Sequence, residues 1–291
     1  MFKREKLFIY FWMVLLVFTL PCLALAQDLG VTAKYSGMAG SFTAMVGDVN
    51  NIYTNPAGLA FLHGGAAAFS TDDHLGLGLD YSNFAVVKEY KHGGFGLGAK
   101  VLDAKEAGIP LVQREVTLAY GQRLPLDLPN NLQIALGANL TSHNARLDGE
   151  QAQGKIGGFA LNLGSVMQWD KIRVGFMIQN FVANTKSDLT LDDKPYVSTT
   201  SLERKMQFGL AYDLNSKTVL TFDGQKDDNL TLTLGAERNL FDNLVVRGGL
   251  SNTGKVTAGM GFNKGAWNID LSYEIHQALG ETSKISAGIS F

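Results

Sequence analysis

The feature that most constrains this chain is a regular alternation of apolar and polar residues along most of its length. In the segment AWNIDLSYEIH, residues 266–276, Trp267 and Leu271 fall on one side of an extended chain, and Asp270 and Glu274 fall on the other. Neighbouring side chains of a β-strand point to opposite faces, whereas a helix brings every third or fourth residue to one face. The alternation therefore predicts a chain built of strands.

The alternating tract divides into about 14 strands, and 12 is the alternative because the first two boundaries are poorly marked. Most are long enough to cross a bilayer when tilted, which takes about 9–11 residues. Strands of soluble proteins usually have about 5–6 residues. The predicted fold is all-β, a transmembrane antiparallel β-barrel, with strands near residues 63–70, 77–88, 93–104, 111–122, 131–145, 156–169, 171–184, 203–214, 217–225, 229–238, 243–251, 255–262, 266–277 and 283–291.

A secreted β-sandwich or β-helix is the alternative fold for such a pattern. The polar face argues against it, because that face carries charged residues that suit a hydrated lumen better than a packed core. Large aromatic residues also fall near strand ends, as in the interfacial girdles of membrane barrels. These aromatic residues are Trp169, Phe181, Tyr212, Phe262, Trp267 and Tyr273.

The two ends of the predicted strands differ. The two clearest long segments between strands, residues 148–155 and 186–201, fall on one side of the barrel. Short turns such as Asp170-Lys171 fall on the other side, where residues 125–131 are a longer exception. This asymmetry is typical of external loops and periplasmic turns, so both termini are expected in the periplasm. The last strand closes on Phe291, which resembles the signal read by the bacterial barrel assembly machinery. That machinery and the outer-membrane lipids are expected partners.

Residues 1–26 have the layout of a signal peptide. A basic head and an apolar run precede the small-x-small pattern Ala24-Leu25-Ala26, which predicts cleavage after Ala26. The run is shorter than the roughly 20 residues of a spanning helix. An uncleaved anchor and lipoprotein processing at Cys22 are the alternatives, and Pro21 disfavours the second. The sequence predicts an exported protein of the outer membrane.

Composition excludes several classes of protein. The formal net charge is −2 and the chain has no basic tract, so nucleic acid is not an expected partner. The one cysteine, Cys22, lies in the predicted signal peptide, so the mature chain is expected to have neither an internal disulfide nor a thiolate zinc site. No phosphate loop, cofactor motif or cluster of metal ligands is apparent. We therefore expect no cofactor and no metal.

An outer-membrane enzyme is a disfavoured hypothesis. His276 shares a strand face with Glu274 and Ser272, a spacing that can serve acid–base chemistry. The alternation alone accounts for this trio, however. We expect no catalytic residue and no enzymatic activity.

Residues 27–62 alternate poorly and form a separate segment before the barrel of residues 63–291. Asn55 suits a helix N-cap, and Pro56 suits the first helical position, where a missing N–H costs nothing. A short helix is therefore expected from residue 57 to residue 62. Because the segment is rich in small residues, we expect it to lie inside the barrel as a plug.

The string GMAGSFTAMVGDVNNIYTNPAGLA, residues 37–60, resembles the N-terminal signature of FadL-type outer-membrane transport proteins, and more closely that of their PorV/PorQ-like relatives. The resemblance implies a 14-stranded barrel with an N-terminal plug. This chain differs from that family in being short and in having small loops. Its sequence therefore does not indicate an elaborate external binding groove. The matching residues are Gly37, Gly40, Phe42, Thr43, Ala44, Asp48, Asn55, Pro56, Ala57 and Gly58.

A barrel of this size leaves a lumen, since about eight strands already enclose a space that side chains fill. The FadL resemblance implies passive transport of hydrophobic or amphipathic small molecules, with sideways exit where strand pairing is interrupted. Cations facing the lumen can pair with a substrate carboxylate. The candidate substrate-binding residues are Lys100, Arg173, Arg247 and Lys284. The alternative is that they neutralise lumen carboxylates such as Glu115, Asp223, Glu237 and Glu274.

The PorV/PorQ resemblance implies a second hypothesis, a non-enzymatic barrel adaptor of type IX-like secretion that binds secretion-system proteins. An adaptor should have a closed lumen and exposed apolar surface on its external loops. The short loops favour transport, and the N-terminal string favours the adaptor. We rank transport first.

Overall fold

The computed structural model describes residues 31–73, 77–149, 152–191, 194–277 and 280–291. The predicted signal peptide and its cleavage site after Ala26 lie outside these residues. No helix within the described ranges is long and apolar enough to span a membrane.

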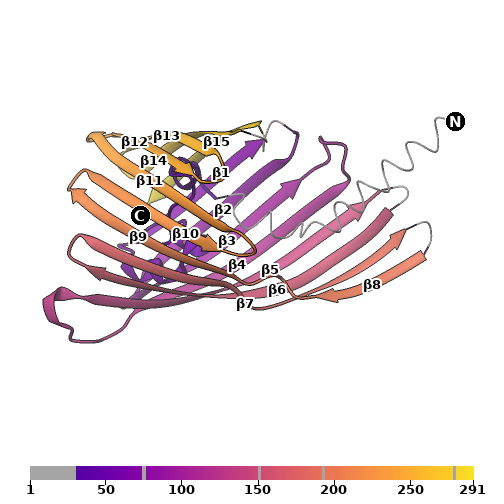
Figure 1. Ribbon diagram of the computed structural model, residues 1–291, viewed down its shortest axis with the longest axis horizontal. Helices are drawn as coiled ribbons and strands as arrows, with labels where there is room; N and C mark the ends of the chain where they lie inside the picture. The colour runs from indigo at the N-terminus through magenta and orange to yellow at the C-terminus, as the bar shows by residue number, and fades with distance from the viewer. Residues whose placement is uncertain (1–30, 74–76, 150–151, 192–193, 278–279) are drawn as a thin grey trace.

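One antiparallel sheet of 15 strands forms the body of the molecule, and all of its strands except β8 close into a ring (Figure 1). The ring has the 14 strands that the alternation predicts. Its members are β1 (Gly65–Asp73), β2 (Asp80–Tyr90), β3 (Gly93–Asp103), β4 (Leu111–Arg123), β5 (Gln133–Asp148), β6 (Ala152–Trp169), β7 (Ile172–Leu191), β9 (Lys205–Asn215), β10 (Thr218–Lys226), β11 (Leu230–Phe241), β12 (Leu244–Ser251), β13 (Lys255–Lys264), β14 (Trp267–His276) and β15 (Gly280–Ser290).

Alternation sets the two faces of the ring as predicted. On β14 the outward Trp267 is 63% exposed and Ile269 is 50% exposed, whereas the inward Asp270 is 3% exposed. The same apolar outer face recurs on the other strands, and it suits contact with lipid chains. On β6 the outward series has Lys155 before the exposed Phe159, which places the first part of that strand beyond the apolar band.

One predicted loop is a β-hairpin. β7 pairs with β9 along its first half and with β8 (Lys194–Thr200) along its second half, and β8 pairs with β7 alone. Residues 186–201 were expected to form an external loop; most of them instead extend the wall beyond the neighbouring strands (Figure 1). The sequence of residues 186–201 is rich in serine and threonine and lacks a sustained alternation, so the pattern does not reveal the hairpin.

The chain closes its ring at Phe291. The Phe291 N–H donates to the Gly65 carbonyl at 2.8 Å, and the Gly65 N–H donates to the Phe291 carbonyl at 2.6 Å. The Lys88 ammonium lies 5.1 Å from the centre of the Phe291 ring. The first and last strands are therefore joined at the end of the barrel that carries the short turns.

Residues 31–62 contact the inward faces of the strands and lie within the ring (Figure 1). They contain α3 (Ala33–Ser36), α4 (Asn51–Thr54) and the 3-10 helix η1 (Pro56–Phe61). The short helix expected after Asn55 is present, in 3-10 form. α3 contacts β13, β14 and β15, and η1 contacts β3, β4, β5 and β6.

Candidate functional site: the lumen and its N-terminal segment

Inward-facing glycines provide room for the N-terminal segment. A Cβ on Gly121 would overlap the Pro56 carbonyl, and a Cβ on Gly175 would overlap the Thr43 carbonyl. Glycine weakens a strand by about 0.5–1 kcal/mol relative to alanine, so close approach of another backbone is the usual reason to place it there. Similar close approaches occur at Gly94, Gly96, Gly98, Gly137, Gly164, Gly209, Gly235, Gly249 and Gly259.

Asn55 fixes the start of η1 and joins the segment to the wall. Its Oδ1 accepts the Ala57 N–H at 3.2 Å, which is the predicted cap. Its Nδ2 donates to the carbonyl of Thr43 at 2.8 Å and to that of Ser165 on β6 at 3.0 Å. All three bonds involve a side chain that is completely buried, so the N-cap is also a tertiary anchor.

Three glycines of the string that resembles the FadL-type signature serve close packing. Gly37 faces Gly259 of β13, and Gly40 has a φ of +85°, which a residue with a Cβ rarely adopts. A Cβ on Gly58 would crowd the side-chain amide of Asn51, whose Oδ1 accepts the Asp48 N–H at 2.9 Å. The motif is thus explained by contacts inside the barrel.

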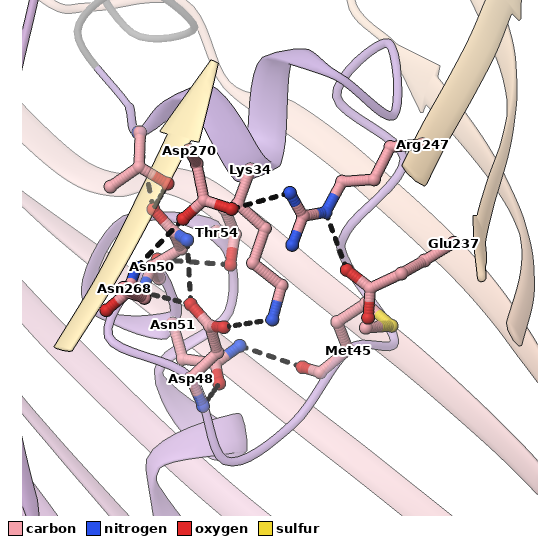
Figure 2. Close-up of polar contacts among 11 residues, drawn as sticks. Lys34, Met45, Asp48, Asn50, Asn51, Thr54, Glu237, Arg247, Asn268 and Asp270 are labelled. Atoms are coloured by element: carbon pink, nitrogen blue, oxygen red, sulfur yellow. Dashed lines mark hydrogen bonds and ion pairs between the residues drawn. The ribbon is translucent and has the colours of Figure 1, made fainter. Parts of the chain in front are cut away.

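A cluster of charged residues lies between the segment and the wall (Figure 2). Lys34 and Asp48, both from the segment, form an ion pair at 2.7 Å. Arg247 of β12 pairs through Nε with Glu237 of β11 at 2.7 Å, and through Nη1 with Asp270 of β14 at 2.6 Å. The Arg247 side chain is 5% exposed, so its two carboxylates supply the compensation that a buried charge requires.

The electrostatics of Lys34 and Asp48 follow from this arrangement. Burial alone would lower the pKa of Lys34, but the carboxylates of Asp48 and Glu237 outweigh it and raise that pKa. Burial alone would raise the pKa of Asp48, but Lys34 and hydrogen bonds from Asn50 lower it. Both groups are therefore charged at neutral pH.

Two other predicted cations also have acidic partners. Lys284 of β15 lies 3.2 Å from Asp72 of β1, and both side chains are buried. Arg173 of β7 forms a two-pronged ion pair with Asp213 of β9, at 2.8 and 2.5 Å. Asp72 and Asp213 were absent from the predicted lumen carboxylates, although the alternation of their strands places both on the inward face.

Lys100, the fourth predicted cation, faces Glu115 across the β3–β4 ladder. Its ammonium lies 4.3 Å from the centre of the Tyr53 ring. Glu115 also lies 3.0 Å from His143 Nδ1 and accepts a bond from Gln113. The four predicted cations come from four different strands, and each has its own acidic neighbour. Contact with a substrate stays a prediction for all of them.

The β6–β7 ladder is interrupted at one level. Leu161 pairs with Val182 and Leu163 pairs with Ile178, so residues 179–181 stand opposite Asn162 alone. Such a bulge bends the strand and removes ladder hydrogen bonds. β7 also leaves β9 here, since the last β7–β9 pair involves Gln179. We call this place the wall break.

Three buried asparagines connect the wall break with the N-terminal segment. Asn139 Nδ2 donates to the Ile52 carbonyl at 2.7 Å, and Asn162 Nδ2 donates to Asn139 Oδ1 at 2.6 Å. Asn162 Oδ1 then accepts the backbone N–H of Asn180 at 2.6 Å. Sequence reasoning missed this asparagine chain (Asn139, Asn162 and Asn180), since alternation marks the first two only as inward-facing. Among the described residues, no group of three or more His, Cys, Asp or Glu side chains is placed to hold a metal ion.

Several solved structures share this fold. The Ralstonia pickettii toluene transporter TbuX is 14% identical, with a TM-score of 0.60 over 90% of this chain and 97% of its own. The CymD monoaromatic hydrocarbon channel is 15% identical, with a TM-score of 0.63 over 91% and 98%. A Pseudomonas aeruginosa FadL homologue is 11% identical, with a TM-score of 0.63 over 90% and 98%. At these identities the likeness concerns the fold. None of the curated proteins compared with the chain matches it.

A family model gives the more specific result. The model of the type IX secretion system membrane protein PorP/SprF matches residues 83–291. The match begins after the string that resembles the PorV/PorQ signature, so it does not test that branch. Because it spans well over half of the sequence, the chain belongs to the PorP/SprF family of outer-membrane barrels.

Proposed function

We propose that hydrophobic or amphipathic small molecules cross the outer membrane passively through this barrel and leave its lumen sideways at the wall break. The observation that carries the proposal is the asparagine chain. It connects the segment inside the barrel with the one level at which the β6–β7 ladder is interrupted. A shift of the segment therefore acts directly on the backbone of the break.

The surroundings of the wall break suit apolar solutes. Phe181, Val182 and Met206 are 41–49% exposed on the outward side, where lipid chains would contact them. The bulge removes ladder hydrogen bonds, and the Asn180 N–H donates to the side-chain amide of Asn162 instead. Fewer backbone bonds therefore join the two strands at this level than in a regular ladder. TbuX and CymD, which share the fold, are described as a toluene transporter and a hydrocarbon channel.

Uptake into liposomes tests the proposal. The full-length barrel should admit a fatty acid and exclude a small hydrophilic sugar. Asn162→Ala removes the centre of the asparagine chain and should raise fatty-acid uptake several-fold, because the segment no longer holds the break closed. Asn144→Ala is the control, since Asn144 is exposed on the outside of β5. Fatty-acid uptake no faster than in empty liposomes, in every form, would contradict the proposal.

Family membership favours a second candidate function, an adaptor of type IX secretion that binds secretion-system proteins. The closely seated segment agrees with the filled lumen of an adaptor. A relation to PorV/PorQ-like proteins would support the adaptor function, and it rests on the matching residues of the N-terminal string. Deleting the gene in the producing bacterium should then remove proteins from the medium and leave fatty-acid uptake unchanged. Normal secretion by the deletion strain would contradict the adaptor.

We also propose that residues 1–26 are removed after Ala26, that residues 27–62 are the plug, and that residues 63–291 are the barrel. The likeness to transport barrels supports a protein without enzymatic activity. Intact-mass measurement of the purified protein tests the processing step. A mature chain that begins at Gln27 is the expected result, and one that begins at Met1 would contradict it.

A further inference from the structure

A cavity of about 120 Å³ lies between the N-terminal segment and the inward face of the wall. The segment contributes Tyr35 and Gly40, and the wall contributes residues from β9, β10, β11, β13, β14 and β15. The wall residues lie toward the strand ends opposite Phe291. The cavity is separate from the wall break and from the charged cluster around Arg247.

The uncharged lining consists mainly of amides and hydroxyls. Gln207 and Gln225 are joined by a bond of 2.7 Å between Nε2 of the first and Oε1 of the second. Thr231, Thr233 and Ser272 add hydroxyl groups. Each of these groups both donates and accepts hydrogen bonds, so the lining matches a ligand whose groups do the same. Hydroxyl groups meet this requirement, whereas hydrocarbons do not.

The charged lining residues are compensated within the chain. Lys255 lies 3.7 Å from Glu274, and the second lining cation, Lys284, has its own partner in Asp72. The Asp223 carboxylate accepts the backbone N–H groups of Phe42 and Thr43, at 3.0 and 2.8 Å. A charged ligand would have to compete with these partners. The cavity therefore favours a neutral solute.

We propose that this cavity binds a small, neutral, polyhydroxylated solute of the polyol or monosaccharide class. Its volume corresponds to several water molecules at about 30 Å³ each, which is the scale of such a solute. The Tyr35 ring in the lining offers a flat apolar surface for the C–H groups of a sugar. The inference goes beyond the proposed route for hydrophobic molecules and does not depend on it.

Calorimetric titration of the detergent-solubilised, full-length barrel tests the inference, with glucose and glycerol as probes. Saturable binding of at least one probe is expected. Gln225→Leu keeps most of the side-chain volume and removes the amide, and Thr231→Val removes one hydroxyl with little change of shape. Each should weaken binding about tenfold. Gln168→Leu is the matched control, because Gln168 lies on β6 and does not line the cavity.

Circular dichroism and heat-dependent gel mobility of each variant establish that its barrel is folded. The inference is overturned if neither probe binds saturably, or if folded Gln225→Leu and Thr231→Val both bind as tightly as the wild type. Displacement of glucose by lower concentrations of glutamate or lysine would also overturn it, because the cavity would then prefer charge.

Discussion

At the scale of single residues, the lumen is organised by compensated charges. Arg247 of β12 has one carboxylate on the adjacent strand β11 and one on β14, two strands away, and the Lys34–Asp48 pair of the N-terminal segment lies beside it (Figure 2). Removing one partner of a buried pair typically costs about 3–5 kcal/mol, because the other charge is left without compensation. These residues therefore position the segment against β11, β12 and β14, and binding a substrate would require them to exchange partners.

The Lys34–Asp48 pair predicts a defined dependence of stability on pH. The pKa of Asp48 is lowered by folding, so its contribution is complete above the unfolded value near 3.8 and is lost as pH falls through the lower folded value. The pKa of Lys34 is raised, so its contribution is complete below 10.5 and is lost only as pH rises through the higher folded value. The pair therefore stabilises the fold throughout the neutral range.

The Lys34 and Asp48 side chains are 25% and 14% exposed, so losing this pair should cost less than losing a fully buried one, about 1 kcal/mol. Asp48→Asn should therefore lower the thermal unfolding midpoint at pH 7 by about 2–4 °C. The deficit should stay constant from about pH 5 to pH 9 and shrink below about pH 4, where the wild type loses the same charge. The difference in midpoint between the variant and the wild type is measured by thermal unfolding in detergent at several pH values. Asp127→Asn, on an exposed connection, is the control. A deficit that is as large at pH 3 as at pH 7 would contradict the assignment.

Sequence reasoning reached the inward-facing charges but not all of their partners. Alternation places Arg247 and Glu237 on one face, and they pair as the alternative reading of the lumen cations anticipated. The partner of Lys284 depends on the register between the first and last strands, which lie far apart in sequence. Asn180 could not be predicted, because the bulge that contains it breaks the alternation on which the prediction depends.

At the scale of elements, the strands and the N-terminal segment are matched to each other. Gly121 and Gly175 are two of the inward positions that keep a Cβ out of the space taken by the segment's backbone. The sequence analysis did not predict that inward-facing glycines would contact the segment. Alternation predicts that Gly121 and Gly175 lie on the inward face. It does not predict their contact with a segment more than sixty residues away in the sequence.

Gly121→Ala should displace η1, because its Cβ would overlap the carbonyl of Pro56. Limited proteolysis in detergent should then cut within residues 31–62 faster than in the wild type. Gly248→Ala is the matched control, since the nearest atom to its Cβ would be 3.8 Å away, and alanine favours a strand slightly over glycine. Equal rates of cleavage in the two variants would show that the segment is not held by the inward glycines.

The β7–β8 hairpin shows where alternation stops being informative. Along the ring, lipid on one side and a polar lumen on the other impose opposite chemistries on neighbouring residues. In β8 the neighbouring residues Tyr196 and Val197, which point to opposite faces, are both apolar and exposed, at 52% and 67%. With no difference between the two faces, a strand and a loop have the same sequence pattern there.

At the scale of the whole molecule, closure of the ring depends on the pairing of β1 with β15. These strands are separated in sequence by nearly the whole barrel, and long-range pairing of this kind is slow. Phe291 lies at the end of that ladder, bonded through its backbone to Gly65. Its ring is 59% exposed and contributes little packing.

The variant Phe291→Ala separates closure of the barrel from recognition of Phe291 by the assembly machinery. It keeps both backbone bonds to Gly65 and removes only the aromatic ring. The contact with Lys88 that is lost contributes about 0.5–1 kcal/mol, too little to prevent folding. We therefore expect the variant to refold in detergent as the wild type does, yet to accumulate several-fold less in the outer membrane of growing cells. Phe241→Ala, with a ring 66% exposed at the end of β11, is the control and should accumulate normally. Fractionation of membranes and refolding of purified chains supply the two measurements. If Phe291→Ala fails equally in both, the ring serves folding; if it accumulates like Phe241→Ala, the assembly machinery does not read this residue.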